Sequence, residues 1–230
     1  MRTSHRITAE FLGTAFLLAA IVGSGIMGER LDGGNAAVAL LANSVATGAM
    51  LVVLIVTLGP ISGAHFNPLV TVTSYFQGML SAGYALSYLM AQVAGALVGV
   101  ASANFMFGLS VFQFSQHTRA GVPQLFSEFV ATFGLLLVIL FSTKFAPQNV
   151  AFTVAAYITA AYWFTSSTSF ANPAVTMARA LTDTFSGIRP ADVPGFVVAQ
   201  TLGGACSVAV YQQMIHKPAQ AAKTDGKGTV

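Results

Sequence analysis

Two Asn-Pro pairs stand inside apolar stretches of the sequence, at Asn67-Pro68-Leu69 and Asn172-Pro173-Ala174. Proline suits the first position of a helix, and an asparagine in front of it accepts hydrogen bonds from the unsatisfied amides there. Each pair therefore predicts a loop followed by a short helix. The start of such a helix acts electrostatically, because the helix dipole places partial positive charge at the N-terminus.

Three ionisable side chains lie near these pairs or inside apolar runs. Glu10 and Glu128 are functional candidates because an ionisable residue in a membrane span is costly. Each of them is either part of a proton relay or a carboxylate that accepts hydrogen bonds from the amides of a broken loop. His65 either holds the loop before Asn67 in place or acts as a pH gate.

The rest of the sequence offers no catalytic chemistry. No nucleophile and base stand at motif spacing, and no second histidine, cysteine or carboxylate stands at metal-ligand spacing from His65. We therefore expect no catalytic residue, no metal site and no cofactor. The net charge of +3 is too small to indicate a nucleic-acid partner, and the single cysteine, Cys206, excludes a disulfide within the chain.

The composition places these residues in a membrane protein. Only 17 of 230 residues are Asp, Glu, Lys or Arg and 55% are hydrophobic, which excludes a cytosolic globular domain. Six charge-poor runs are long enough to span a bilayer: 8–27, 36–58, 82–107, 124–143, 149–168 and 194–215. The two connectors that hold the Asn-Pro pairs are too short and too broken by Gly and Pro to cross. The expected fold is an all-α integral membrane protein with six transmembrane helices and two re-entrant half-helices.

An internal repeat organises these spans. The segment 9–16 recurs at 127–134, the Asn-Pro connector recurs, and 88–92 recurs at 196–200, in the same order. The first repeat covers residues 1–117 and the second covers 118–217, and a disordered cytoplasmic tail follows at 218–230. Each repeat has three spans, so the second enters the membrane upside down.

This inversion lets the two short helices enter from opposite faces and meet N-terminus to N-terminus at the midplane. Their dipoles then repel cations there. The symmetric Gln92 and Gln200 suit hydrogen bonding to the half-helix backbone, and the pair Gly95 and Gly99 suits close helix crossing within the chain.

The basic residues set the orientation. With the N-terminus inside, six lie on the cytoplasmic side against one acid, and four lie outside against four acids. We expect both termini in the cytoplasm and the protein in the inner (plasma) membrane as a multi-pass protein.

With two Asn-Pro boxes inside an inverted repeat and a glutamate in the first span of each half, the sequence resembles the aquaporin or major intrinsic protein family over nearly its whole length. The resemblance implies that Asn67 and Asn172 donate hydrogen bonds to permeating molecules at the pore centre; the alternative is that both are only helix caps. It favours a loop-scaffold role for Glu10 and Glu128. It also implies a homotetramer in the lipid bilayer, with one pore in each protomer.

The boxes depart from the family pattern at two positions. Leu69 stands where alanine is usual and adds bulk near the midplane, and Val175 replaces the arginine that generally follows the second box. Family spacing then gives an outer filter of Thr47, Ala160, Ser169 and Val175, without a charge or a ring. Such a filter resembles that of bacterial aquaglyceroporin-like members associated with arsenic resistance.

Arg179 lies four residues after Val175, on the same face of the short helix. It either restores a cation near the filter or lies in the outer vestibule, stabilised by the helix C-terminal dipole and Asp183.

We expect a passive channel for small uncharged solutes: glycerol-like polyols, urea, undissociated metalloid acids such as arsenite or methylated arsenicals, and water, with protons and ions excluded. A water-selective aquaporin with an atypical filter is the alternative. A secondary transporter is a second alternative, because inverted repeats with broken helices also build carriers.

Overall fold

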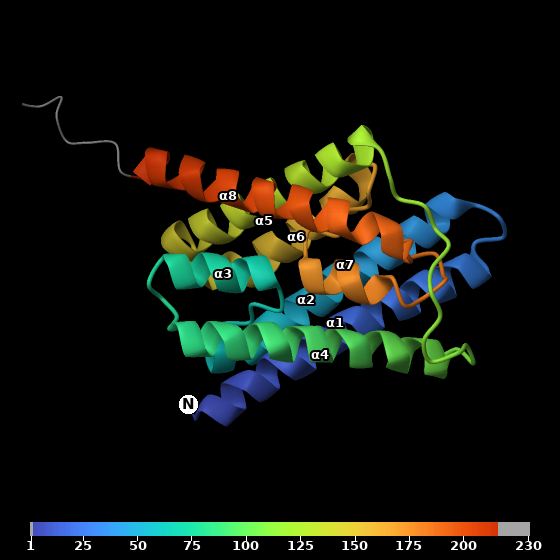
Figure 1. Ribbon diagram of the computed structural model, residues 1–230, viewed down its shortest axis with the longest axis horizontal. Coiled ribbons are helices and arrows are strands. Elements are labelled where there is room, and N and C mark those ends of the chain that lie inside the picture. Colours follow the sequence, from blue (N-terminus) through green and yellow to red (C-terminus); the bar gives the residue numbers. More distant parts are fainter. Residues whose placement is uncertain (1, 216–230) are drawn as a thin grey trace, which may run out of the picture.

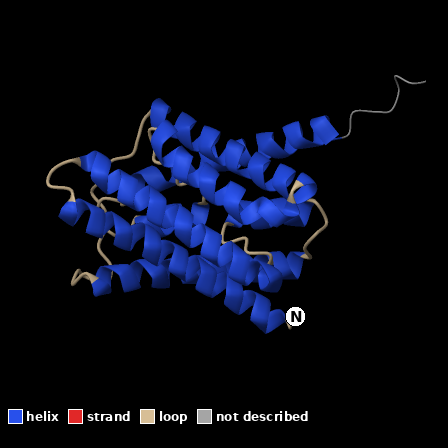
Figure 2. Ribbon diagram, turned by 180° about the vertical axis from the view of Figure 1, so that it is seen from behind, coloured by secondary structure: helices blue, strands red, loops and turns tan. Residues whose placement is uncertain are grey.

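The computed structural model describes residues 2–215 and folds this part of the chain into a bundle of helices (Figure 1). Figure 2 shows that the described residues form no strand. The predicted tail at 218–230 lies outside the described residues. Six helices make up the bundle: α1 (Thr3–Leu31), α2 (Ala36–Ser62), α4 (Ala82–Met106), α5 (Val122–Phe145), α6 (Val150–Phe164) and α8 (Val193–Ile215).

Two half-helices lie inside the bundle, α3 (Pro68–Phe76) and α7 (Pro173–Arg179). Two short 3-10 turns, η1 (Pro147–Asn149) and η2 (Pro190–Asp192), lead into α6 and α8. Each half-helix begins at the proline of an Asn-Pro pair, as the sequence predicts. The all-helical membrane fold with its two half-helices is therefore confirmed.

Five of the long helices, α1, α2, α4, α5 and α8, are long and apolar enough to cross a membrane. The remaining helix, α6, has only 15 residues, which corresponds to roughly 22 Å. The predicted fifth span, 149–168, is therefore too long at its C-terminal end. The reason is local: Thr165 leaves the helix in an extended conformation, and Thr168 and Ser169 have positive φ.

The two halves pack in the same way. In the first half α1 contacts both α2 and α4, and in the second half α5 contacts both α6 and α8. The halves meet through α2 and α6. The N-terminal end of α1 and the C-terminal end of α8 lie at the same end of the bundle, which we call the terminal face, and the C-terminal end of α1 lies at the other end, the distal face (Figure 1).

Glycines allow the closest helix crossings. A Cβ atom at Gly95 of α4 would lie 2.3 Å from the carbonyl oxygen of Phe11 in α1, and one at Gly99 would lie 2.3 Å from the carbonyl oxygen of Ala15. The expected close crossing within the chain is confirmed. Gly203 of α8 has the equivalent place, since its Cβ would lie 2.3 Å from the carbonyl oxygen of Phe129 in α5.

We therefore predict that Gly95→Ala destabilises the folded protein by about 1–3 kcal/mol, because the added methyl group meets backbone that cannot move aside. Gly83→Ala is the matched control in the same helix, since a Cβ there meets nothing within 4 Å. Thermal unfolding in detergent measures both. Equal melting temperatures for the two variants would contradict the close crossing.

Candidate functional site

Both asparagines of the Asn-Pro pairs cap the half-helices. The Oδ1 atom of Asn67 accepts a hydrogen bond from the amide of Leu69 at 2.9 Å. The Oδ1 atom of Asn172 accepts from the amides of Ala174 at 3.0 Å and Val175 at 3.3 Å. Each cap satisfies amides that the first turn of a helix leaves free.

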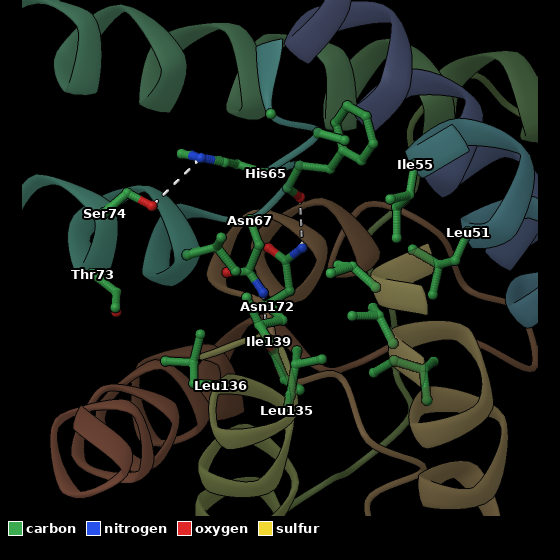
Figure 3. Close-up of a pocket in the computed structure, with 18 of the residues that line it drawn as sticks. Leu51, Ile55, His65, Asn67, Thr73, Ser74, Leu135, Leu136, Ile139 and Asn172 are labelled. Atoms are coloured by element: carbon green, nitrogen blue, oxygen red, sulfur yellow. Dashed lines mark hydrogen bonds between the residues drawn. The ribbon is translucent and has the colours of Figure 1, made fainter. Parts of the chain in front are cut away.

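The same asparagines also join the two halves of the bundle. The Nδ2 atom of Asn67 donates to the carbonyl of Ala171 at 2.8 Å, and the Nδ2 atom of Asn172 donates to the carbonyl of Phe66 at 2.8 Å. Figure 3 shows the two side chains next to each other. The two asparagines therefore cap the half-helices and also join the two halves. Because an amide nitrogen carries two hydrogens, one on each asparagine remains for another acceptor.

The loops in front of the asparagines have matching backbones. Ala64 and Phe66 have φ of 51° and 48°, and Ser169 and Ala171 have φ of 51° and 47°. These residues stand three and one positions before each asparagine. Left-handed conformations at non-glycine residues are strained, and they persist only where surrounding contacts hold them.

Glu10 holds the first of these loops. Its carboxylate is fully buried and accepts hydrogen bonds from the amides of His65 at 3.0 Å and Phe66 at 2.8 Å. It also accepts from the Ser62 hydroxyl at 2.6 Å and from Gln92 at 2.8 Å. These contacts are those of a loop scaffold.

Glu128 holds the second loop in the equivalent way. It is fully buried and accepts from the amides of Phe170 and Ala171, both at 2.9 Å, and from Gln200 at 2.6 Å. The carboxylates thus satisfy backbone donors that lie too deep in the bundle for bulk water.

The two glutamines extend each scaffold to its half-helix. Gln92 also donates to the Thr71 hydroxyl at 2.9 Å, and Gln200 donates to the Thr176 hydroxyl at 2.8 Å. The expectation of bonds to the half-helix backbone is wrong in this detail, because the partners are side-chain oxygens.

His65 lies between the first loop and its half-helix. Its Nδ1 atom lies 3.0 Å from the Thr71 hydroxyl, its Nε2 atom lies 3.5 Å from the Ser74 hydroxyl (Figure 3), and its ring contacts Tyr88 edge to face. Among the described residues no group of three histidine, cysteine or acidic side chains could hold a metal ion.

One cavity of about 420 Å³ connects these features. It begins near the terminal face at Arg6, Gln77 and Lys144 and passes both Asn67 and Asn172 (Figure 3). Towards the distal face it is lined by Thr47, Tyr162, Ser169, Phe170, Val175 and Arg179. The arrangement is a path through the bundle with two neutral amides at its middle.

Comparisons with known proteins agree with this geometry. The family model described as major intrinsic protein matches residues 1–156, which is more than half of the chain. The chain belongs to the major intrinsic protein family. The family and its fold are those of membrane channels rather than enzymes.

Alignments with individual relatives extend over most of this major intrinsic protein. The aquaglyceroporin AqpS of Rhizobium meliloti (strain 1021) is 51% identical over 212 residues, which are 92% of this chain and 91% of the relative. A probable TIP-type aquaporin of Medicago truncatula is 32% identical over 75% of this chain and 73% of its own length. The X-ray structure of the aquaglyceroporin from Plasmodium falciparum matches 94% of this chain and 98% of its own with a TM-score of 0.73, and at 18% identity it supports the fold.

Three of the four expected filter residues, Thr47, Ser169 and Val175, line the distal part of the cavity. Ala160 does not line the cavity. It is exposed on the outer side of α6, so the residue count that placed it in the filter was wrong. Tyr162 lines the cavity instead, and its hydroxyl lies 3.2 Å from that of Thr47. The distal part of the cavity therefore contains a ring, whereas the expected set of filter residues had none.

The signal that identifies Tyr162 is helical spacing. Val150, Val154, Ile158 and Tyr162 follow one another at four-residue intervals, and all four line the cavity. Residues four apart share one face of a helix, whereas a shift of two residues points to the opposite side.

Leu69 is also placed differently from the expectation. Its side chain is buried against Val70, Leu136 and Ile139 and does not line the cavity. The added bulk therefore fills the contact of α3 with its neighbours and does not narrow the path.

Arg179 does not pair with Asp183, its expected partner. Asp183 accepts a hydrogen bond from the amide of Gln116 at 2.8 Å, and the only salt bridge among residues 2–215 joins Arg189 to Asp192. Arg179 is 1% exposed, so it does not project into an open vestibule.

A second arginine, the partly buried Arg119, was not singled out in the sequence. It donates to the carbonyls of Gly187 at 2.7 Å, Ser167 at 3.2 Å and Phe185 at 3.2 Å, and so ties three parts of the distal loops together. Burial lowers the pKa of its guanidinium, and the nearby Glu128 carboxylate opposes this shift.

We predict that Glu128→Gln lowers the free energy of unfolding by about 2–3 kcal/mol, because one of two buried amides then faces a donor instead of an acceptor. Glu29→Gln on the distal face is the control, since Glu29 is exposed. Thermal unfolding and solute uptake by reconstituted vesicles check the prediction. A Glu128→Gln protein with the parent's stability and uptake would show that the carboxylate is no scaffold.

Proposed function

We propose that the protein is a passive channel for small uncharged solutes, which include glycerol-like polyols, urea and undissociated metalloid acids such as arsenite or methylated arsenicals, together with water. Protons and ions are excluded. The observation that carries the proposal is the continuous cavity that passes Asn67 and Asn172 between the N-termini of two opposed half-helices.

The middle of this path suits neutral molecules. Two half-helix N-termini face it and supply partial positive charge, which opposes cations. Asn67 and Asn172 each keep one amide hydrogen for a passing oxygen atom, since the other is bound across the halves. Glu10 and Glu128 are occupied by loop amides, which supports a scaffold role over a proton relay.

The distal part of the path is amphipathic, which supports solutes larger than water. Hydroxyl groups of Thr47, Tyr162 and Ser169 lie among the apolar side chains of Ile21 and Val175. A polyol or a methylated metalloid hydroxide has both polar and apolar surface and matches such a lining. The 51% identical relative is named an aquaglyceroporin, which supports the same solute class.

The proposed location and orientation in the membrane rest on the fold and on the charges of the sequence. The N-terminus and the C-terminal end of α8 lie on one face, and the positive residues of the sequence favour the cytoplasm for that face. We assign the protein to the inner (plasma) membrane. Large apolar side chains such as Phe16, Leu86 and Val198 are exposed around the bundle, which supports contact with lipid and, in a homotetramer, with neighbouring protomers.

A secondary transporter is the main rival. A coupled carrier needs a titratable or ion-binding group free at the midplane. The groups that line the middle of the cavity, Asn67 and Asn172, are neutral amides, and the nearby ring of His65 is engaged by the hydroxyls of Thr71 and Ser74. A channel is therefore the better match.

In reconstituted vesicles we expect uptake of glycerol, urea and undissociated methylarsonous acid to rise linearly with concentration. Val175→Trp should reduce uptake roughly tenfold by filling the path. Val198→Trp is the control, because Val198 lies on the exposed side of α8.

Two outcomes contradict the proposal. Fast water flux without solute uptake would indicate a water-selective aquaporin with an atypical filter. Saturating uptake driven by a proton gradient would indicate a carrier.

A further inference from the structure

Building on the proposed channel, we propose that Arg179 supplies the fixed positive charge of the outer pore from one helical turn beyond Val175. In this chain the charge that position 175 lacks is restored by a residue further along the same half-helix. Arg179 then determines specificity by rejecting cations and donating hydrogen bonds to the oxygen atoms of uncharged solutes.

The half-helix places Arg179 at the cavity. Val175 and Arg179 are four residues apart in α7 and both line the cavity. Helical side chains lean towards the N-terminus of their helix, and the N-terminus of α7 lies at the middle of the path. The guanidinium is therefore directed back along the pore wall.

Phe170 and the distal loop hold the guanidinium there. The central carbon of the guanidinium lies 3.4 Å from the centroid of the Phe170 ring, and the Nε atom donates to the carbonyl of Ser186. A cation stacked on an aromatic face is attracted by the negative face of the ring. Phe170 itself is held by the hydrogen bond that its backbone amide donates to Glu128.

The charge of Arg179 has no counter-ion in the described part of the chain. The salt bridge among residues 2–215 involves Arg189 and Asp192 alone. The Nη1 atom of Arg179 is buried and has no hydrogen-bond partner among these residues, and the same holds for the Ser169 hydroxyl at the cavity wall. A guanidinium without a counter-ion at the cavity wall repels cations and favours the oxygen atoms of a polyol or a metalloid hydroxide.

The contrast with Arg119 identifies which arginine serves the pore. Arg119 lies over the same Phe170 ring at 5.1 Å, but its Nε, Nη1 and Nη2 atoms all donate to loop carbonyls. Arg119 is therefore a structural tie, whereas Arg179 uses only Nε for the fold.

The test compares Arg179→Gln with Arg179→Lys in reconstituted vesicles, since lysine keeps the positive charge and glutamine removes it. Arg179→Gln should raise the proton and potassium leak about tenfold or more, because the fixed charge that rejects cations is lost. Arg179→Lys should keep the leak near the parent's value. The matched control is Arg30→Gln, because Arg30 also stacks on a ring, Phe107 at 5.1 Å, but is exposed and lies outside the cavity.

The outcomes separate this inference from the proposed function. A parent protein without solute uptake overturns the proposed channel and this inference with it. A parent that takes up glycerol, together with an Arg179→Gln protein that leaks no more than Arg30→Gln, overturns only the role of Arg179. If Arg179→Gln does not fold, Arg179→His decides: its potassium leak should rise as the pH is raised and the imidazole loses its charge, and a leak that does not change with pH contradicts the proposal.

Discussion

The interaction on which the structure depends is the hydrogen bonding of two buried carboxylates to the loops that precede the half-helices. A broken loop at membrane depth exposes amides that lipid cannot satisfy. Glu10 and Glu128 each accept two consecutive loop amides, and these bonds hold residues with positive φ in place. Without the carboxylates, the loops would have neither partners for their donors nor compensation for their strain.

The rest of the bundle brings the carboxylates to the loops. Glu10 is carried by α1, which α4 approaches closely at Gly95, and Glu128 is carried by α5, which α8 approaches closely at Gly203. The close crossings place Gln92 and Gln200 beside the carboxylates. The same scaffold then lets Asn67 and Asn172 bond across the midplane, so that the two halves and the path between them form together.

The two halves differ in the residues that line the cavity. The scaffold is nearly the same in both halves, yet the terminal side of the cavity is lined by Arg6, His65 and Lys144, while the distal side has three hydroxyls and the Arg179 guanidinium. In the proposed channel, selection is located at the distal end, where these hydroxyls lie beside Val175. A scaffold shared by the two halves leaves the lining residues free to differ, and in the proposed channel these differences determine which solutes pass.

The sequence predicted the scaffold well and the wall only in part. The Asn-Pro pairs, the repeat and the glutamates are local or repeated patterns, and the positions of Glu10, Glu128, Asn67 and Asn172 follow from them. The placement of Ala160 in the filter was wrong because only an apolar run fixed the residue count along α6. An error of two residues moves a side chain to the opposite face of a helix. The partners of Leu69 and Arg179 depend on packing between elements distant in sequence, which no spacing rule specifies.

The path past Val175 and along the inner face of α6 is the central claim of this account, and thiol accessibility tests it directly. Cys206 is the chain's single cysteine and is exposed, so Cys206→Ser gives a background without thiols. In that background, single variants Val175→Cys, Ile158→Cys and Ala160→Cys are treated with benzyl methanethiosulfonate, and glycerol uptake by reconstituted vesicles is measured. The account predicts that modification blocks uptake through Val175→Cys and Ile158→Cys and leaves Ala160→Cys unaffected. Blocked uptake in Ala160→Cys with unchanged uptake in Ile158→Cys would contradict it.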